Sequence, residues 1–185
     1  MSNDFLKIEY CFDLKEVIIP LRIKRLYAEW QRMLILNDNS ELVEVQALGD
    51  PPEKYIVTFS CKGLIWNEKE SEPSIGENHR MKIYLHKNFP RFPPKLTWLT
   101  DIFHPNILPP SKNGGVCIGN WTPAETLDQL CIRIGEMIQY RNFSITDALN
   151  TEAAAWVASH MDMFPIDLRE FWLSKGNNES IDVDL

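Results

Sequence analysis

The chain has 185 residues, of which 44% are hydrophobic, and a formal net charge of −7 at pH 7. This apolar content is sufficient for the core of one compact domain, which excludes disorder along the whole length. The acidic balance argues against a protein that binds nucleic acid or an anionic membrane by general charge attraction, and no apolar run approaches the roughly 20 residues of a membrane-spanning helix.

The ends of the chain are expected to be extensions of a single core. Residues 1–19 lack a signal-peptide pattern and form an N-terminal extension, the core covers 20–175, and 176–185 is a flexible acidic tail. Apolar and polar residues alternate from Leu6 to Lys15, as they do in strands. This part either adds an edge strand or packs over the first helix.

The first regular element predicted is an amphipathic helix over residues 20–36, opened by Pro20. A turn cluster at 37–40 ends it. Its expected apolar face consists of Ile23, Tyr27, Trp30 and Leu34. The charged residues fall mostly on other faces, namely Arg22, Arg25, Glu29 and Arg32.

Strands are predicted next, followed by helices. The predicted strands cover 41–48, 54–63, 80–86 and 95–100, with a polar loop at 67–78. The predicted helices cover 122–140, 147–161 and, as a short last piece, 167–173. This order indicates an α+β fold with an antiparallel meander sheet.

Capping residues and apolar faces support the two longer helices of this second half. For the first of them, Thr122 is the expected N-cap, with Pro123 at the first position. The second is expected to be capped near Asp147 or Asn150. The apolar face of the first is formed by Leu127, Leu130, Cys131, Ile134, Met137 and Ile138.

The four cysteines have no spacing typical of zinc ligands or a redox pair, so we expect no metal, no cofactor and free thiols in the cytosol. Cys131 lies on the apolar face of a helix and Cys61 in a strand, which indicates buried core thiols. The role of Cys11 stays open. Cys117 lies in "NGGVCIGN", a stretch rich in glycine and asparagine that is typical of an exposed functional loop.

Short motifs follow one another around Cys117, namely Phe89-Pro90, Pro93-Pro94, His104-Pro105-Asn106, Cys117 and Trp121-Thr122-Pro123-Ala124. This order resembles the ubiquitin-conjugating enzyme family. That family has an aromatic-Pro pair, Pro-Pro, a strand, His-Pro-Asn, the active-site cysteine and Trp-Ser-Pro-Ala in the same order. With the leading helix and "DALNTEAA", the resemblance covers roughly residues 20–175 and implies the ubiquitin-conjugating fold.

The resemblance implies thioester chemistry on Cys117. Such an enzyme receives the C-terminal carboxyl of a ubiquitin-like modifier from an activating enzyme and passes it to a lysine of a protein target or to a ligase cysteine. Exchange between thioesters has a leaving thiolate as good as the attacking one, so the loop needs no dedicated histidine base. Aminolysis is harder, because it builds an oxyanion and requires a neutral amine.

Three further residues have roles implied by the family pattern. Asn106 either stabilises the oxyanion or orders the adjacent loop, and His104 is expected to fix its turn by hydrogen bonds, together with Pro105. Asp147 matches an acidic residue that orients and deprotonates the incoming lysine, with a plain helix cap as the alternative.

Contact surfaces are implied as well. Arg22, Lys24 and Arg25 match the basic first helix that meets the activating enzyme, with a solvated helix face as the alternative. The expected ligase-contact loops contain Arg91, where many members have phenylalanine, and Pro123-Ala124.

Two intervals depart from the family pattern. The stretch from His104 to Cys117 is longer than typical and the stretch from Cys117 to Trp121 is shorter, which predicts a reshaped groove around the thioester. So divergent a member is a candidate for a modifier other than ubiquitin, and a bacterial antiviral conjugation system is one hypothesis.

Two other functions compete with the conjugating enzyme. A catalytically inactive scaffold of the same fold is one, although such variants typically lack the cysteine. A cysteine hydrolase that releases modifiers is the other, and it needs a histidine within hydrogen-bond reach of the thiol.

Overall fold

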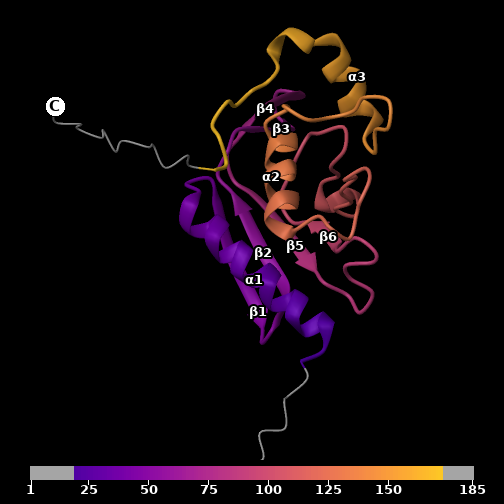
Figure 1. The fold of residues 1–185 in the computed structure, drawn as a ribbon. Helices are drawn as coiled ribbons and strands as arrows, with labels where there is room; N and C mark the ends of the chain where they lie inside the picture. The colour runs from indigo at the N-terminus through magenta and orange to yellow at the C-terminus, as the bar shows by residue number, and fades with distance from the viewer. Residues whose placement is uncertain (1–18, 173–185) are drawn as a thin grey trace, which may run out of the picture.

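The structure is a computed structural model that describes residues 19–172. The expectations for the N-terminal alternation, Cys11 and the acidic tail lie outside these residues. Figure 1 shows the helices α1 (Leu21–Asn39), α2 (Leu127–Ile138) and α3 (Thr151–Ser159). The strands are β1 (Val43–Gly49), β2 (Pro52–Phe59), β3 (Gly63–Asn67), β4 (Glu72–Gly76), β5 (His79–Tyr84) and β6 (Lys95–Trp98). None of the described helices is both long and apolar enough to cross a membrane.

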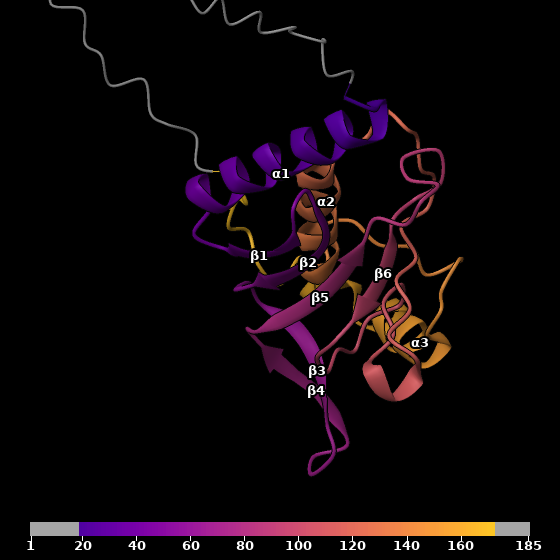
Figure 2. The ribbon, with the colours of Figure 1, turned by 90° about the horizontal axis from the view of Figure 1, so that it is seen from below.

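The predicted four-stranded antiparallel sheet is confirmed. Its strands are ordered β1-β2-β5-β6, and Val57 of β2 pairs with Val45 on one side and Met81 on the other. Tyr55, Val57 and Phe59 are fully buried while the residues between them are partly exposed, which is the period of two that a sheet covered on one face requires. Helices α1 and α2 lie beside this sheet, and α3 lies at the end of the molecule far from α1 (Figures 1 and 2).

The polar loop predicted at 67–78 is wrong in part, because it contains β4. This strand pairs with β3 in a separate two-stranded sheet, with Ile65 opposite Ser74. Only residues 68–71 form the tip of the hairpin. The strand was missed because neither side of the hairpin shows a clear alternation: Trp66 and Ser74 are half-buried, and Ile75 is exposed.

Helix α1 is confirmed, but it continues through the predicted turn to Asn39, and its expected apolar face is wrong in part, since only Ile23 and Trp30 of that face pack on the core. The buried residues are Leu26, Glu29, Met33 and Leu36, whereas Tyr27 and Leu34 are 37% and 43% exposed. Glu29, expected on a polar face, is buried as well. Its carboxylate pairs with Arg25 and accepts a hydrogen bond from the backbone N–H of Leu127 at 2.8 Å, which joins this face of α1 to the start of α2.

Helix α2 begins later than predicted. Thr126, not Thr122, is the N-cap, and it forms a capping box with Gln129. Residues 122–125 instead make a turn, in which the Glu125 N–H donates to the Thr122 carbonyl at 3.0 Å. The predicted apolar face of α2 is buried throughout, including Cys131, and Cys61 is buried in the same core.

The last predicted helix, at 167–173, is wrong over its described part. Residues 164–172 are an extended segment that packs on α2. Its polar groups are used in long-range contacts, such as Lys62 N–H to the Asp167 carboxylate at 2.8 Å and Gln139 Nε2 to the Arg169 carbonyl at 2.8 Å. These bonds hold the backbone extended and seat the buried Phe171 against α2.

Gly135 of α2 is required by this packing. A Cβ at this position would lie 2.3 Å from the ring of Phe171, so Gly135→Ala should lower the free energy of unfolding by roughly 1–3 kcal/mol, measured by urea denaturation. Phe171→Leu in the Gly135→Ala background should recover part of this loss, since the two changes are coupled. Purely additive effects of the two substitutions would contradict the assigned clash.

Candidate active site

Cys117 is held at the end of a short antiparallel contact. Ile107 pairs with Val116, and the N–H of Cys117 donates to the Asn106 carbonyl at 2.9 Å. The long interval before Cys117 is taken up by a 3-10 turn at Pro110–Lys112 and by Gly114. Gly114 has a φ of 65°, and a Cβ there would lie 2.6 Å from the Trp98 carbonyl oxygen, so only glycine fits. The extra residues thus return the chain to Asn106.

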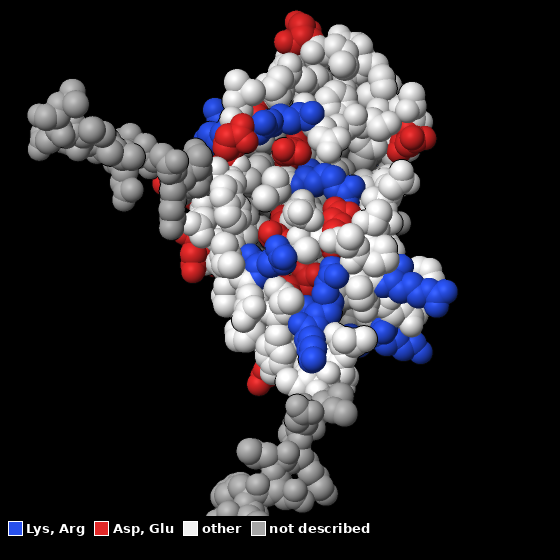
Figure 3. All heavy atoms as spheres, in the orientation of Figure 1, with Lys and Arg blue, Asp and Glu red and all other residues white. Residues whose placement is uncertain are grey.

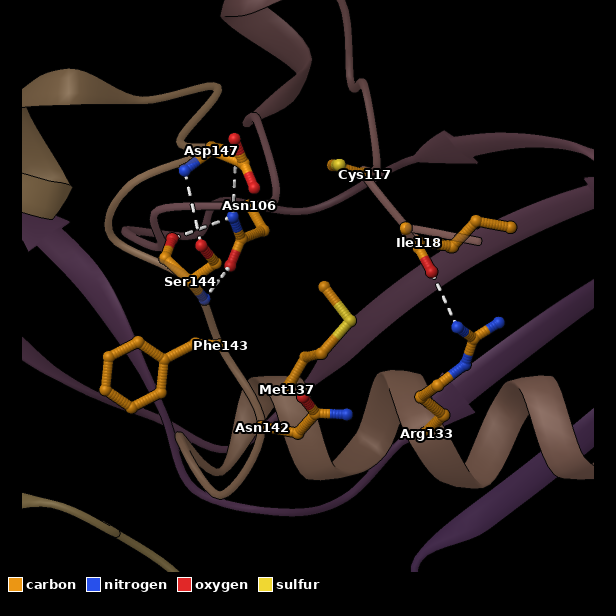
Figure 4. Close-up of a pocket in the computed structure, with 10 residues that line it drawn as sticks. Asn106, Cys117, Ile118, Arg133, Met137, Asn142, Phe143, Ser144 and Asp147 are labelled. Atoms are coloured by element: carbon orange, nitrogen blue, oxygen red, sulfur yellow. Dashed lines mark hydrogen bonds between the residues drawn. The ribbon is translucent and has the colours of Figure 1, made fainter. Parts of the chain in front are cut away.

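A pocket of about 200 Å³ lies beside the Cys117 thiol. Figure 4 shows that the side chain points toward the side of the pocket where Asn106 and Asp147 lie. Met137 and Arg133 of α2 line it from below, and the pocket is completed by Ile118, Gly119, Asn142, Phe143 and Ser144. The structure therefore brings together the three predicted catalytic residues, although they come from two distant stretches of the chain.

The Asn106 side chain is bound to the loop that carries Asp147. Its Nδ2 donates to the carbonyls of Ser144 (2.9 Å) and Asp147 (3.3 Å), and its Oδ1 accepts from the Ser144 N–H at 2.8 Å. Both amide protons are used and the residue is 4% exposed. In this geometry Asn106 orders the loop, and its amide has no proton left for an oxyanion.

The Asp147 carboxylate is exposed at the pocket. The alternative of a helix cap is wrong, because α3 starts at Thr151 and its N-cap is Asn150, whose side chain accepts from Ala153 N. Asp147 precedes the helix in a turn, where its N–H donates to Ser144 Oγ at 3.2 Å. Its side chain remains available to an incoming group.

Hydrogen bonds of His104 and Pro105 hold Asn106 and the segment that follows Asp147 in place. His104 Nδ1 accepts from the Asn106 N–H at 3.0 Å, and the Pro105 carbonyl accepts from Leu149 N and Asn150 N at 2.8 and 2.9 Å. Burial lowers the pKa of His104 to about 3. A fully buried imidazole with so low a pKa is a poor general base at neutral pH, and no histidine lines the pocket.

Trp121 connects the two loops expected to contact a ligase. Its Nε1 donates to the Pro90 carbonyl at 2.9 Å, and its ring lies 5.9 Å from that of Phe89. The neighbouring Arg91 and Ala124 are exposed. Both loops are therefore fixed against one another, with their tips at the surface.

Basic side chains gather where α1 begins, as Figure 3 shows. Arg22, Arg25 and Arg91 line a hollow of about 490 Å³ in this region, and Lys24 is exposed nearby on the same helix. Arg22 is partly neutralised by Glu53 at 2.6 Å. We define Arg22, Lys24 and Arg25 as the basic surface.

Arg25 is also a structural residue. Its guanidinium pairs with Glu29 and donates to the carbonyls of Pro123 (2.9 Å) and Glu125 (2.7 Å). It lies 5.5 Å from the Phe89 ring centroid. Arg25 therefore fixes α1 to the loop that contains Pro123 and Ala124. Helix periodicity does not predict this role.

Arg133 lines the same pocket as Cys117 and was not predicted at the site. Its one signal in the sequence is that it is a cation among the apolar residues of α2. Among the described residues, no group of three or more His, Cys, Asp or Glu side chains is placed to hold a metal ion.

The chain is similar in sequence to known ubiquitin-conjugating enzymes. The family model "Ubiquitin-conjugating enzyme" matches residues 43–171. The chain is 27% identical over 159 residues to Ubiquitin-conjugating enzyme E2 S of Drosophila ananassae, covering 80% of this chain and 66% of that protein. It is 30% identical over 136 residues to Ubiquitin-conjugating enzyme E2 16 of Schizosaccharomyces pombe, covering 71% of this chain and 78% of that protein.

The fold is also similar to a solved structure, the E2 domain of a Toxoplasma gondii ubiquitin conjugating enzyme. The two superpose with a TM-score of 0.55 at 22% identity, covering 78% of this chain and 92% of that chain. This similarity concerns the fold alone. The chain spans 66% of the length of the Drosophila relative.

Proposed function

Because the chain belongs to the ubiquitin-conjugating enzyme family, we propose that it receives the C-terminal carboxyl of ubiquitin or a ubiquitin-like protein as a thioester on Cys117. The observation that carries this proposal is the pocket. A half-buried thiol faces Asn106 and Asp147, and no histidine lines the same space. Such a site is suited to acyl exchange between thiols and to attack by an amine, and it lacks the base that a cysteine hydrolase requires.

The proposed reaction has two balanced steps. In the first, the Cys117 thiolate attacks the thioester carbonyl on the activating enzyme, a new C–S bond forms, and the activating enzyme's thiolate leaves. In the second, a lysine amine attacks the Cys117 thioester, the Cys117 thiolate leaves, and the amine loses a proton as the amide forms. The Asp147 carboxylate orients that amine and accepts its proton, directly or through water. Transfer to a ligase cysteine is a second thiol exchange and needs no base.

Each partner has a surface in this proposal. The activating enzyme meets the basic surface, and a ligase meets Arg91 and the segment Pro123–Ala124. The acceptor is a lysine of a protein target. The relatives named above come from eukaryotes, and these similarities do not support a bacterial antiviral system. The proposed modifier is ubiquitin or a ubiquitin-like protein.

The test is formation of a reducible adduct. Incubation of the chain with ubiquitin, its activating enzyme and ATP should give a band shifted by one ubiquitin, which disappears with reductant and is absent without ATP. A scaffold of the same fold gives no adduct. A hydrolase gives no adduct either, but it cleaves a preformed ubiquitin ester. Either of these results would overturn the proposal.

Charge reversal on α1 should slow loading without affecting discharge. Lys24→Glu combined with Arg22→Glu should raise the concentration needed for half-maximal loading, more so at low salt, because screening weakens attraction between exposed charges. Arg25 is left unchanged, since it also holds the Pro123 and Glu125 carbonyls. The control is Arg32→Glu, an exposed cation farther along the helix. Equal loading by the parent and the double variant at both salt concentrations would mean that the helix face is merely solvated.

A further inference from the structure

The five residues from Cys117 to Trp121 have few attachments to the rest of the fold. Cys117 N is bound to the Asn106 carbonyl, and Trp121 Nε1 is bound to Pro90. Between them, Gly119 has a φ of 65° and open space beside it. Within the described residues, the backbone of residues 118–120 has one hydrogen bond. The Ile118 carbonyl accepts it from Arg133 Nη1 at 2.6 Å, as Figure 4 shows.

Arg133 is itself fixed in place. Its Nη2 donates to Glu125 Oε1 at 2.5 Å, and the two side chains are 26% and 17% exposed. A guanidinium has donors in a rigid planar fork, so binding both acceptors at once defines its orientation. The backbone carbonyl of Glu125 is in turn bound by Arg25 at 2.7 Å, which anchors the backbone from which this carboxylate extends.

We propose, on the basis of the function inferred above, that Arg133 is a positioning residue that holds the Ile118 carbonyl and thereby keeps the Cys117 thiol in the pocket, with Glu125 orienting Arg133. The guanidinium binds the peptide unit between Ile118 and Gly119, one residue beyond the cysteine (Figure 4). Since that unit is planar, fixing its carbonyl restricts the backbone at Ile118 and Gly119, and with it the residue next to Cys117. The Cys117 backbone thus lies between two anchored points, its own N–H and the Ile118 carbonyl.

The expected result is a separation of kcat from KM in loading. With the chain varied against a fixed amount of charged activating enzyme, Arg133→Met should lower kcat by about 10- to 10²-fold, because misplacement of a reacting group by about 1 Å costs up to that factor. The KM for the chain should change by less than about twofold, since the basic surface is untouched. Lys24→Glu should show the opposite pattern, a raised KM with kcat unchanged.

Conservative and coupled variants separate positioning from loss of folding. Arg133→Lys keeps the charge but reaches one acceptor at a time, so its kcat should be intermediate. Glu125→Ala should also lower kcat, and Glu125→Ala with Arg133→Met should be no slower than Arg133→Met alone. The matched control is Arg141→Met, which removes an arginine whose side chain is equally exposed and paired with Glu170, and which does not line the pocket. Thermal unfolding of every variant checks the fold.

Amide hydrogen exchange gives a readout that does not depend on charging. Exchange at the Cys117 N–H should be faster in Arg133→Met and unchanged in Arg141→Met. If the parent is not charged at all, the proposed function fails, while exchange still tests the anchoring. A kcat of Arg133→Met equal to that of the parent, or additive effects with Glu125→Ala, would overturn the positioning role. Should Arg133→Met not fold, Glu125→Ala and Arg133→Lys can be compared with the parent in the same way, in the kcat of loading and in amide exchange at Cys117.

Discussion

Cys117→Ala should abolish the adduct with ubiquitin completely, because no other described thiol is accessible to a protein-sized acyl donor. Cys61 and Cys131 are both fully buried. Burial also raises the pKa of both thiols, that of Cys61 to about 12, so neither provides thiolate at neutral pH. Cys117→Ser should still accept the acyl group, but slowly and as an oxyester that thiol reductants do not cleave. Gel electrophoresis with and without reductant distinguishes the two products.

The control for this prediction removes the other cysteines. Cys11, Cys61 and Cys131 changed together to alanine should leave a reducible adduct, provided that circular dichroism shows an intact fold. Cys61 and Cys131 lie in the core, so some loss of stability is expected without loss of charging. A reducible adduct that persists in Cys117→Ala would end the assignment of this cysteine.

Asp147→Ala should load normally but discharge to free lysine about 10²-fold more slowly near neutral pH, which is within the usual range for general acid–base catalysis. The defect should shrink as the pH rises toward the lysine pKa of about 10.4, since the free amine then becomes plentiful without help from a carboxylate. The measurement is single-turnover discharge of purified thioester across a pH series, with hydrolysis in the absence of lysine subtracted.

Asn106→Ala should share this behaviour, because its amide holds the loop that carries Asp147. Its defect should shrink with pH in parallel, and Asn106→Ala combined with Asp147→Ala should be no slower than the slower single variant. Asp162→Ala is the control, an exposed carboxylate outside the pocket. If the Asn106 defect is large and independent of pH, the amide acts on the oxyanion. A defect of Asp147→Ala that is independent of pH would remove Asp147 from the handling of the amine.

Local sequence patterns predicted those elements in which one face of the chain is clearly apolar. The buried face of α2 was predicted because its apolar residues recur with a period near 3.6, and the four strands of the main sheet were predicted as runs of strand-forming residues between turn signals. The prediction was wrong in part for α1, whose fully buried residues are Leu26, Met33, Leu36 and the charged Glu29. That carboxylate is stable in the core only through Arg25 and the Leu127 N–H, which are tertiary contacts absent from any local window.

The candidate site was predictable as a set of residues but not as a geometry. The order of the motifs placed Cys117 near the His-Pro-Asn triplet. The hydrogen bonds of Asn106 to Ser144 and Asp147, however, join residues 38 and 41 positions apart, which no local pattern predicts. The N-cap of α2 was predicted four residues too early, at Thr122, whereas in the structure it is Thr126, whose N–H donates to Gln129 Oε1. Arg133 and its carbonyl partner have no motif, since a contact between a helix and a loop depends on the fold.

The most direct test of the central claim is the location of the acyl group. The adduct of the parent chain with ubiquitin should be digested under acidic, non-reducing conditions, and the modified peptide identified by mass spectrometry. We expect the C-terminal residues of ubiquitin to be attached through a thioester to the peptide that contains Cys117, and this mass to be lost on treatment with reductant. Attachment to another cysteine, or to a lysine through an amide that survives reductant before any discharge step, would contradict it.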